Sequence, residues 1–181
     1  MKVSSLASAI MTVAVTAIST TGMAADQGHG VVNFKGSIID APCSIAQESK
    51  YQTVDMDQVS NVSLKNGGKS SPTAFKIELH GCELGALKSA TATFTGAPSF
   101  GNSDLLGLKG TAKGASLAIA DHSGELIKLG TTSPAQSLSD GNTSLQFNAY
   151  LQGDMLAEEG GAAEIVPGSF EAVANFTLAY Q

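Results

Sequence analysis

The sequence predicts an all-β protein built as an antiparallel sandwich or barrel. Apolar and polar residues alternate with a period of two in several short segments, which is typical of strands that bury one face. Turn-forming residues separate these segments, and the 181-residue chain contains 20 glycines. No helical period lies between the segments, so the strands are expected to pair through short connections in one antiparallel fold.

The first 24 residues are predicted to be a secretory signal peptide. Lys2 supplies a positive charge, residues 6–18 form an uncharged apolar run, and Gly22 and Ala24 are the small residues of a cleavage site. The run of 13 residues is shorter than the roughly 20 needed for a membrane-spanning helix. The mature chain is therefore expected to begin at Ala25.

Residues 25–35 are expected to form an extended N-terminal extension outside the compact fold. Gly28, Gly30, Val32 and Phe34 would share one face of an extended chain, and the first residues of the segment are small or polar. Taken alone, the segment fits a frayed terminus equally well.

Residues 36–181 are expected to form one domain, which is long enough to bury a core. Its most regular segments place larger apolar side chains on one face and polar or small side chains on the other. These segments are Phe75–Leu79, Thr91–Thr95, Ala115–Ile119 and Leu145–Leu151.

Two cysteines, Cys43 and Cys82, are separated by 39 positions in a chain with an export signal. An oxidising compartment favours a structural disulfide between them. A metal or redox pair would more often show two intervening residues, and that spacing is absent.

The C-terminal segment, residues 168–181, contains the longest alternation in the chain. It fits an ordinary core strand, but a last strand at a sheet edge would expose backbone groups that invite another strand. The members of its apolar face are Gly168, Phe170, Ala172, Ala174, Phe176, Leu178 and Tyr180.

Composition argues against several functions. The chain has a net charge of −6 and contains no Arg, which disfavours binding to nucleic acid or to an anionic membrane surface. His29, His80 and His122 do not show metal-ligand spacing, so no catalytic, metal-binding or cofactor-binding residue and no cofactor is predicted. A sugar-binding sandwich would be expected to display aromatic rings, of which this chain has few.

Both ends of the mature chain and the cysteines resemble those of the chaperone–usher pilins, most closely the rod subunits of the P-pilus type. The family's ending has a glycine fourteenth from the C-terminus and a penultimate tyrosine, positions that Gly168 and Tyr180 occupy here. The similar stretches are Gln27–Gly30, Phe34–Gly36, Asp40–Ile45, Ile77–Leu79 before Cys82, and Phe170–Phe176 followed by Leu178 and Tyr180.

The resemblance implies an incomplete immunoglobulin-like sandwich that lacks its last strand. A periplasmic chaperone would fill the resulting groove, and at an outer-membrane usher the extension of the next subunit would replace it. Gly28, Gly30, Val32 and Phe34 would then be the donor residues, and the apolar face of residues 168–181 would be the acceptor. The product would be a head-to-tail filament of identical and related subunits, a surface fimbria that supports cell adhesion. A monomeric secreted β-sandwich adhesin is the alternative.

Overall fold

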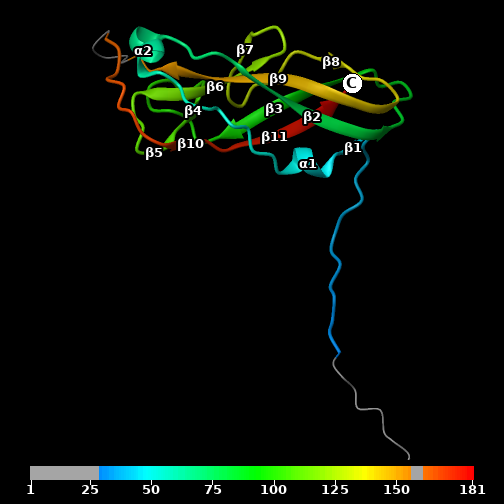
Figure 1. The fold of residues 1–181 in the computed structure, drawn as a ribbon. Helices are drawn as coiled ribbons and strands as arrows, with labels where there is room; N and C mark the ends of the chain where they lie inside the picture. Colours follow the sequence, from blue (N-terminus) through cyan, green and yellow to red (C-terminus); the bar gives the residue numbers. More distant parts are fainter. Residues whose placement is uncertain (1–28, 156–160) are drawn as a thin grey trace, which may run out of the picture. The chain divides into compact units, whose positions relative to one another are not determined.

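The computed structural model describes residues 29–155 and 161–181. The predicted signal peptide, residues 1–24, and Gly28 of the predicted donor set lie outside the described residues. The described chain divides at residue 38 into an arm (residues 29–38) and a β domain (residues 39–181), drawn in Figure 1. The arm contains no helix or strand, and all of its residues are exposed to solvent.

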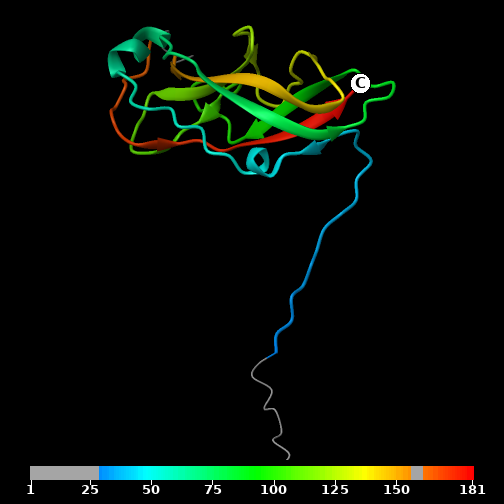
Figure 2. The ribbon, with the colours of Figure 1, turned by 45° about the vertical axis from the view of Figure 1, so that its right-hand side comes forward.

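Two main antiparallel sheets form the layers of the β domain (Figures 1 and 2). The larger sheet has the strand order β1–β2–β9–β6–β4, with β7 also paired to β6, and the smaller sheet has the order β11–β3–β8. Strands β5 and β10 pair separately. The strands are β1 Ser44–Ile45, β2 Thr73–Cys82, β3 Ser89–Gly96, β4 Leu106–Gly107, β5 Lys109–Gly110, β6 Ala115–Asp121, β7 Leu126–Ile127, β8 Gln136–Ser137, β9 Gly141–Gly153, β10 Phe170–Glu171 and β11 Ala174–Tyr180.

Within residues 29–155 and 161–181, helical structure is limited to short pieces on the connection between β1 and β2. They are α1 Gln47–Lys50, α2 Asn61–Leu64 and a 3-10 turn, Lys65–Gly67. Ser60 caps α2, because its side chain accepts a hydrogen bond from the backbone of Val62. Among the residues that the structure describes, none of the helices has the length and apolar character needed to span a membrane.

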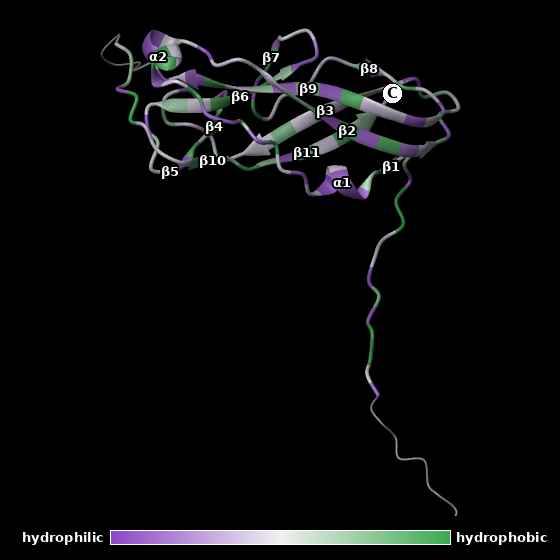
Figure 3. Cartoon of the chain, in the orientation of Figure 1, coloured by the Kyte–Doolittle hydropathy of each residue, from purple (hydrophilic) through white to green (hydrophobic). Residues whose placement is uncertain are grey.

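The predicted period of two is confirmed in β2 and β9, which are neighbours in the larger sheet. Ile77 lies opposite Leu145, and neither side chain has exposed surface. Hydrophilic and hydrophobic bands alternate along both strands in Figure 3. The predicted segments Thr91–Thr95 and Ala115–Ile119 lie within β3 and β6.

An aromatic cluster joins the two sheets. Phe75 and Phe147 come from the larger sheet, and Phe94 comes from β3 in the smaller one. The ring centroids of Phe94 and Phe147 are 5.0 Å apart in an edge-to-face arrangement, and those of Phe75 and Phe147 are 5.6 Å apart. Such pairs add to the stabilisation that burial alone provides.

Strand β6 differs from the expectation of one buried face, because both of its faces are buried. Ala118 and Ala120 have no exposed surface and pack with Leu105 and Tyr150 in a second small cluster, against which Leu126 also packs. Leu105, just before β4, and Leu126 of β7 therefore help to cover the outer face of the larger sheet at this point.

The C-terminal alternation forms two strands rather than one. Strand β10 pairs with β5, whereas β11 pairs with β3 in the smaller sheet. Ala172 and Val173 lie between them and belong to neither. The chain changes its partner strand here. The even-numbered residues face inward both before and after the break, so the alternation in the sequence continues through it.

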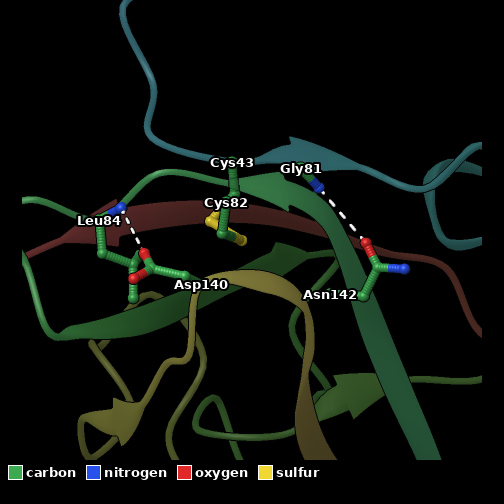
Figure 4. Close-up of a disulfide and its surroundings, with 6 residues drawn as sticks. All are labelled: Cys43, Gly81, Cys82, Leu84, Asp140 and Asn142. Atoms are coloured by element: carbon green, nitrogen blue, oxygen red, sulfur yellow. Dashed lines mark hydrogen bonds between the residues drawn. A yellow bond between two sulfur atoms is a disulfide. The ribbon is translucent and has the colours of Figure 1, made fainter.

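The Cys43–Cys82 disulfide is confirmed and joins the chain just before β1 to the end of β2 (Figure 4). The register of β2 on β9 shifts between Leu79 and Cys82. Asp140, just before β9, and Asn142, at its start, hold this corner with their side chains. Asp140 Oδ1 accepts a hydrogen bond from the Leu84 backbone N–H at 3.0 Å, and Asn142 Oδ1 accepts one from the Gly81 N–H at 3.4 Å.

Candidate functional site

Strand β11 forms one edge of the smaller sheet. It pairs along its whole length with β3, from Ala174 opposite Gly96 to Tyr180 opposite Ala90. No other strand among the described residues pairs with its second edge. A seven-residue edge with unpaired backbone groups is a template for a further strand.

An open groove of about 1410 Å³ runs beside this edge within the β domain. The C-terminal segment, residues 165–176, forms one wall, and residues 49–60 form the other. Between them lies an apolar floor contributed by both sheets. The floor residues are Phe75, Phe94, Leu106, Leu108, Ala115, Leu117, Ile119, Ala149 and Leu151.

The floor belongs to two apolar clusters. One is the main core, which includes the aromatic cluster and against which Phe176 packs. The other, called here the groove-end cluster, is formed by buried Leu64, Ala115 and Leu151 with Val59, Leu108, Leu117, Ile165 and Phe170 packed against them. All eight residues of the groove-end cluster line the groove.

The opposite wall is held only loosely to the larger sheet. Residues 52–60 form neither helix nor strand. The side-chain amide of Gln52 donates to the Lys76 carbonyl at 3.3 Å, and Asp57, which has a φ of 50°, donates its backbone N–H to Asp55 Oδ1 at 2.9 Å. This wall therefore belongs to neither of the two main sheets.

The predicted acceptor residues divide into two groups. Gly168, Phe170, Ala172, Ala174 and Phe176 line the groove.

Leu178 and Tyr180 do not line the groove; they pack, half-buried, against the main core. Burial raises the pKa of the Tyr180 hydroxyl. The open part of the groove therefore lies along the first half of the predicted acceptor segment and continues to the groove-end cluster.

The predicted donor residues are exposed where the structure describes them. Val32 is 73 % exposed and Phe34 is 91 % exposed, while Gly30 has no atom close to the position of an added Cβ. Val31, Ile38 and Ile39 are also exposed. Exposed large apolar side chains at this density are unfavourable in water.

Sequence reasoning did not identify the second wall or the groove-end cluster. Val59, Leu64 and Ile165 lie on a coil segment, a four-residue helix and a loop, so no period marks them. Val59 and Leu64 showed only isolated apolar character between polar neighbours, and Ile165 lies beside a single further apolar residue, Val166.

The three histidines are all exposed, with His80 on β2 and His122 in a turn. In the described ranges no group of three or more His, Cys, Asp or Glu residues is placed to hold a metal ion. Of the tyrosines, Tyr51 is exposed and Tyr150 is buried beneath Lys69, whose Nζ lies 5.0 Å from the ring centroid.

Comparison with known proteins gives consistent matches. The family model described as "Fimbrial protein" matches residues 32–181. The chain is 57 % identical over 172 residues to the Fimbria A protein of Serratia marcescens, covering 95 % of this chain and 96 % of that one. It is 46 % identical to the Major MR/P fimbria protein of Proteus mirabilis, over the full length of both.

A solved structure of a chaperone–usher pilus, described for the basis of its rod uncoiling, is similar in fold. Its subunit is 36 % identical, with a TM-score of 0.69 over 86 % of this chain and 97 % of the other. The resemblance noted from the sequence is thus confirmed, as is the antiparallel fold of the pilins. The chain belongs to the fimbrial protein family and is a structural subunit of a surface fimbria.

Proposed function

We propose that this subunit polymerises by strand donation, in which the N-terminal extension of one copy completes the sandwich of the next. The observation that carries the proposal is the free edge of β11 beside an open apolar groove. The same chain carries exposed Val32 and Phe34 on an extended arm. Donor and acceptor are thus separate surfaces of one molecule.

Strand donation would satisfy the edge and the groove together. A donated strand pairs its backbone with β11, and each such hydrogen bond contributes about 0.5–1.5 kcal/mol net. Burying Val32 or Phe34 on the floor contributes roughly 1.5–3 kcal/mol each. Because the two surfaces differ, the contact is head-to-tail and does not close, which produces a filament.

The proposed assignments follow the sequence analysis. The donor residues are Gly28, Gly30, Val32 and Phe34 in the extension, residues 25–35, and residues 36–181 form the pilin domain. A periplasmic chaperone would occupy the groove before assembly, and an outer-membrane usher would be the place of exchange. The predicted signal peptide and the relative's description as a chaperone–usher pilus support these partners. The role is structural rather than enzymatic.

The proposal is tested by placing a charge on one face of the arm. Phe34→Asp should abolish fibres on the cell surface, because the carboxylate would be buried on an apolar floor. Asn33→Asp, on the opposite face, should assemble as the unaltered chain does. Electron microscopy of cells and heat-resistant ladders on denaturing gels provide the readouts.

The result that contradicts strand donation is a Phe34→Asp chain that forms normal fibres. A second contradicting result is a mature chain that remains a stable monomer in which its own residues fill the groove. That second outcome would favour the monomeric adhesin.

A further inference from the structure

We infer that Asp154 and the loop of residues 99–103 form an acid-strengthened clasp at the end of β9, in which protonation of Asp154 favours the closed position of the loop. This segment, called here the tip loop, lies on the connection between β3 and β4. The clasp belongs to the β domain itself, so the inference does not depend on the proposed strand donation.

The clasp is a chain of hydrogen bonds that ends on a carboxylate. The backbone N–H of Gly101 donates to Ser99 Oγ at 3.2 Å, and the hydroxyl oxygens of Ser99 and Ser116 are 2.6 Å apart. The Ser116 hydroxyl, which has no exposed surface, also lies within hydrogen-bond distance of Asp154 Oδ1. Ser116 belongs to β6 and Asp154 follows β9, so the chain of bonds joins the tip loop to two strands of the larger sheet.

Asp154 is the fixed half of the clasp. Its backbone N–H donates to the Gly114 carbonyl at 2.9 Å, and its own carbonyl accepts a hydrogen bond from the Ala163 N–H at 2.9 Å. These two bonds hold the Asp154 backbone between the start of β6 and the segment that follows β9. The tip loop is therefore the half that can move.

The tip loop is held to the rest of the domain mainly by the clasp. Its other hydrogen bonds lie within the connection itself, such as those from the Ser99 N–H to the Leu105 carbonyl and from the Leu105 N–H to the Asn102 carbonyl. Phe100 is fully exposed, so it does not anchor the loop by packing. A segment with so few buried contacts opens at low cost in free energy.

Closing the tip loop takes the Asp154 carboxyl out of water. Gly101 lies so close that a Cβ added to it would be 2.6 Å from both Cβ and Cγ of Asp154. The loop backbone thus covers one side of the carboxyl. Burial raises the pKa of Asp154 above its ordinary value of 3.8, although the hydrogen bond from Ser116 acts in the opposite direction.

Asp154 has no ion-pair partner among the residues that the structure describes. On the segments around it, the Lys113 ammonium donates to the Gly110 carbonyl at 3.3 Å, and the Lys69 ammonium lies over the Tyr150 ring. The other charged residues on these segments are Lys65, Asp104, which pairs with Lys128, and Glu164. A positive charge therefore does not offset the cost of burying the Asp154 carboxylate.

The hydrogen bonds of the clasp survive protonation. An ionised Asp154 accepts the Ser116 proton, whereas a protonated Asp154 can donate to Ser116, which then donates to Ser99. The two states differ mainly in the cost of covering a charge, so the closed loop binds the proton more tightly than the open loop does. Stabilisation of the closed loop grows as the pH falls through the raised pKa, and it is complete below 3.8, where the open loop is protonated too.

The first test is hydrogen–deuterium exchange, read by mass spectrometry, of fibres assembled from the full chain. After correction for the intrinsic effect of pH, residues 97–104 should exchange more slowly at about pH 4 than at about pH 7. Asp154→Asn cannot titrate at this position and should lose that pH response. Asp104→Asn is the matched control, because it removes a carboxylate from the same connection and should keep the response.

Three outcomes of this experiment would overturn the clasp. The first is equal corrected exchange at both pH values in the unaltered fibre. The second is a pH response in Asp154→Asn that equals the response of the unaltered chain. The third is loss of the response in Asp104→Asn, which would assign it to the other carboxylate.

The second test is a carbon-13 NMR titration of the Asp154 carboxyl in the same fibres. Its midpoint should lie above 3.8 in the unaltered chain. Gly101→Ala should return the midpoint toward the ordinary value, because the added Cβ would push the tip loop off the carboxyl. A midpoint at or below 3.8 in the unaltered chain, or one that Gly101→Ala leaves unchanged, would refute the proposed role of the loop.

Discussion

Removal of the Cys43–Cys82 disulfide is expected to lower the free energy of unfolding by about 4 kcal/mol. The bond closes a loop of 39 residues, and the chain-entropy relation for a loop of that length gives this magnitude at 25 °C. The bond acts mainly on the unfolded chain, because without it the loop gains conformational freedom when the domain unfolds.

The assay is urea unfolding, followed by circular dichroism, of the mature chain with its groove filled by an excess of a synthetic peptide of residues 25–35. With a slope of about 1–3 kcal/mol per molar urea, the loss should move the midpoint by roughly 2 M. Cys43→Ala, Cys82→Ala and the double variant should all lose the same amount, since either change removes the same bond.

Two outcomes would refute this reasoning. Single losses that add in the double variant would show that each cysteine stabilises by its own packing rather than through the bond. A loss below about 1 kcal/mol would show that the unfolded chain is already restricted in this region without the bond.

Other predictions address packing and acid stability. Gly96→Ala should lower the free energy of unfolding by about 1–3 kcal/mol in a thermal unfolding assay, because the new Cβ would collide with the Leu106 side chain and with the Val173 carbonyl oxygen. Gly161→Ala faces open space and should be nearly neutral in that assay. The hydrogen bond from the Ser123 hydroxyl at 2.7 Å, together with two backbone N–H groups of the turn, holds the pKa of Asp121 below its ordinary value of 3.8. That stabilisation is complete above the ordinary pKa and is lost as pH falls through the lower folded-state pKa. Between pH 5 and pH 2 the free energy of unfolding should therefore fall less in Asp121→Asn than in the unaltered chain. An equal fall in both would contradict the assignment.

The sequence predicted the strands well where one face meets the core. The alternation of Ile77 and Leu79 with polar residues reports burial directly, since each outward position tolerates a polar side chain. The disulfide could also be predicted from the sequence, because two cysteines in an exported chain have a single possible pairing.

The limits of prediction have physical causes. Alternation reports which way a side chain points, but not which strand lies beside it, so the partner change at Ala172 and Val173 left no trace. For the same reason the pattern did not separate Leu178, which its own domain half-buries, from Ala174, which stays exposed in the groove. The groove-end cluster remained hidden because Leu64 and Ile165 lie outside any periodic element.

The position of the disulfide has a mechanical consequence for a fibre under tension. A pull on the N-terminal arm travels along the backbone and reaches Cys43 before it reaches β1, which is only two residues long and would peel away easily. The sulfur bridge diverts the load covalently into the end of β2. There it acts along a strand paired with β9 at eight positions from Thr73 to Cys82, so that many hydrogen bonds share the shear at once. The disulfide thus transmits the force to β2 and β9, the longest pair of strands, although the first strand is short.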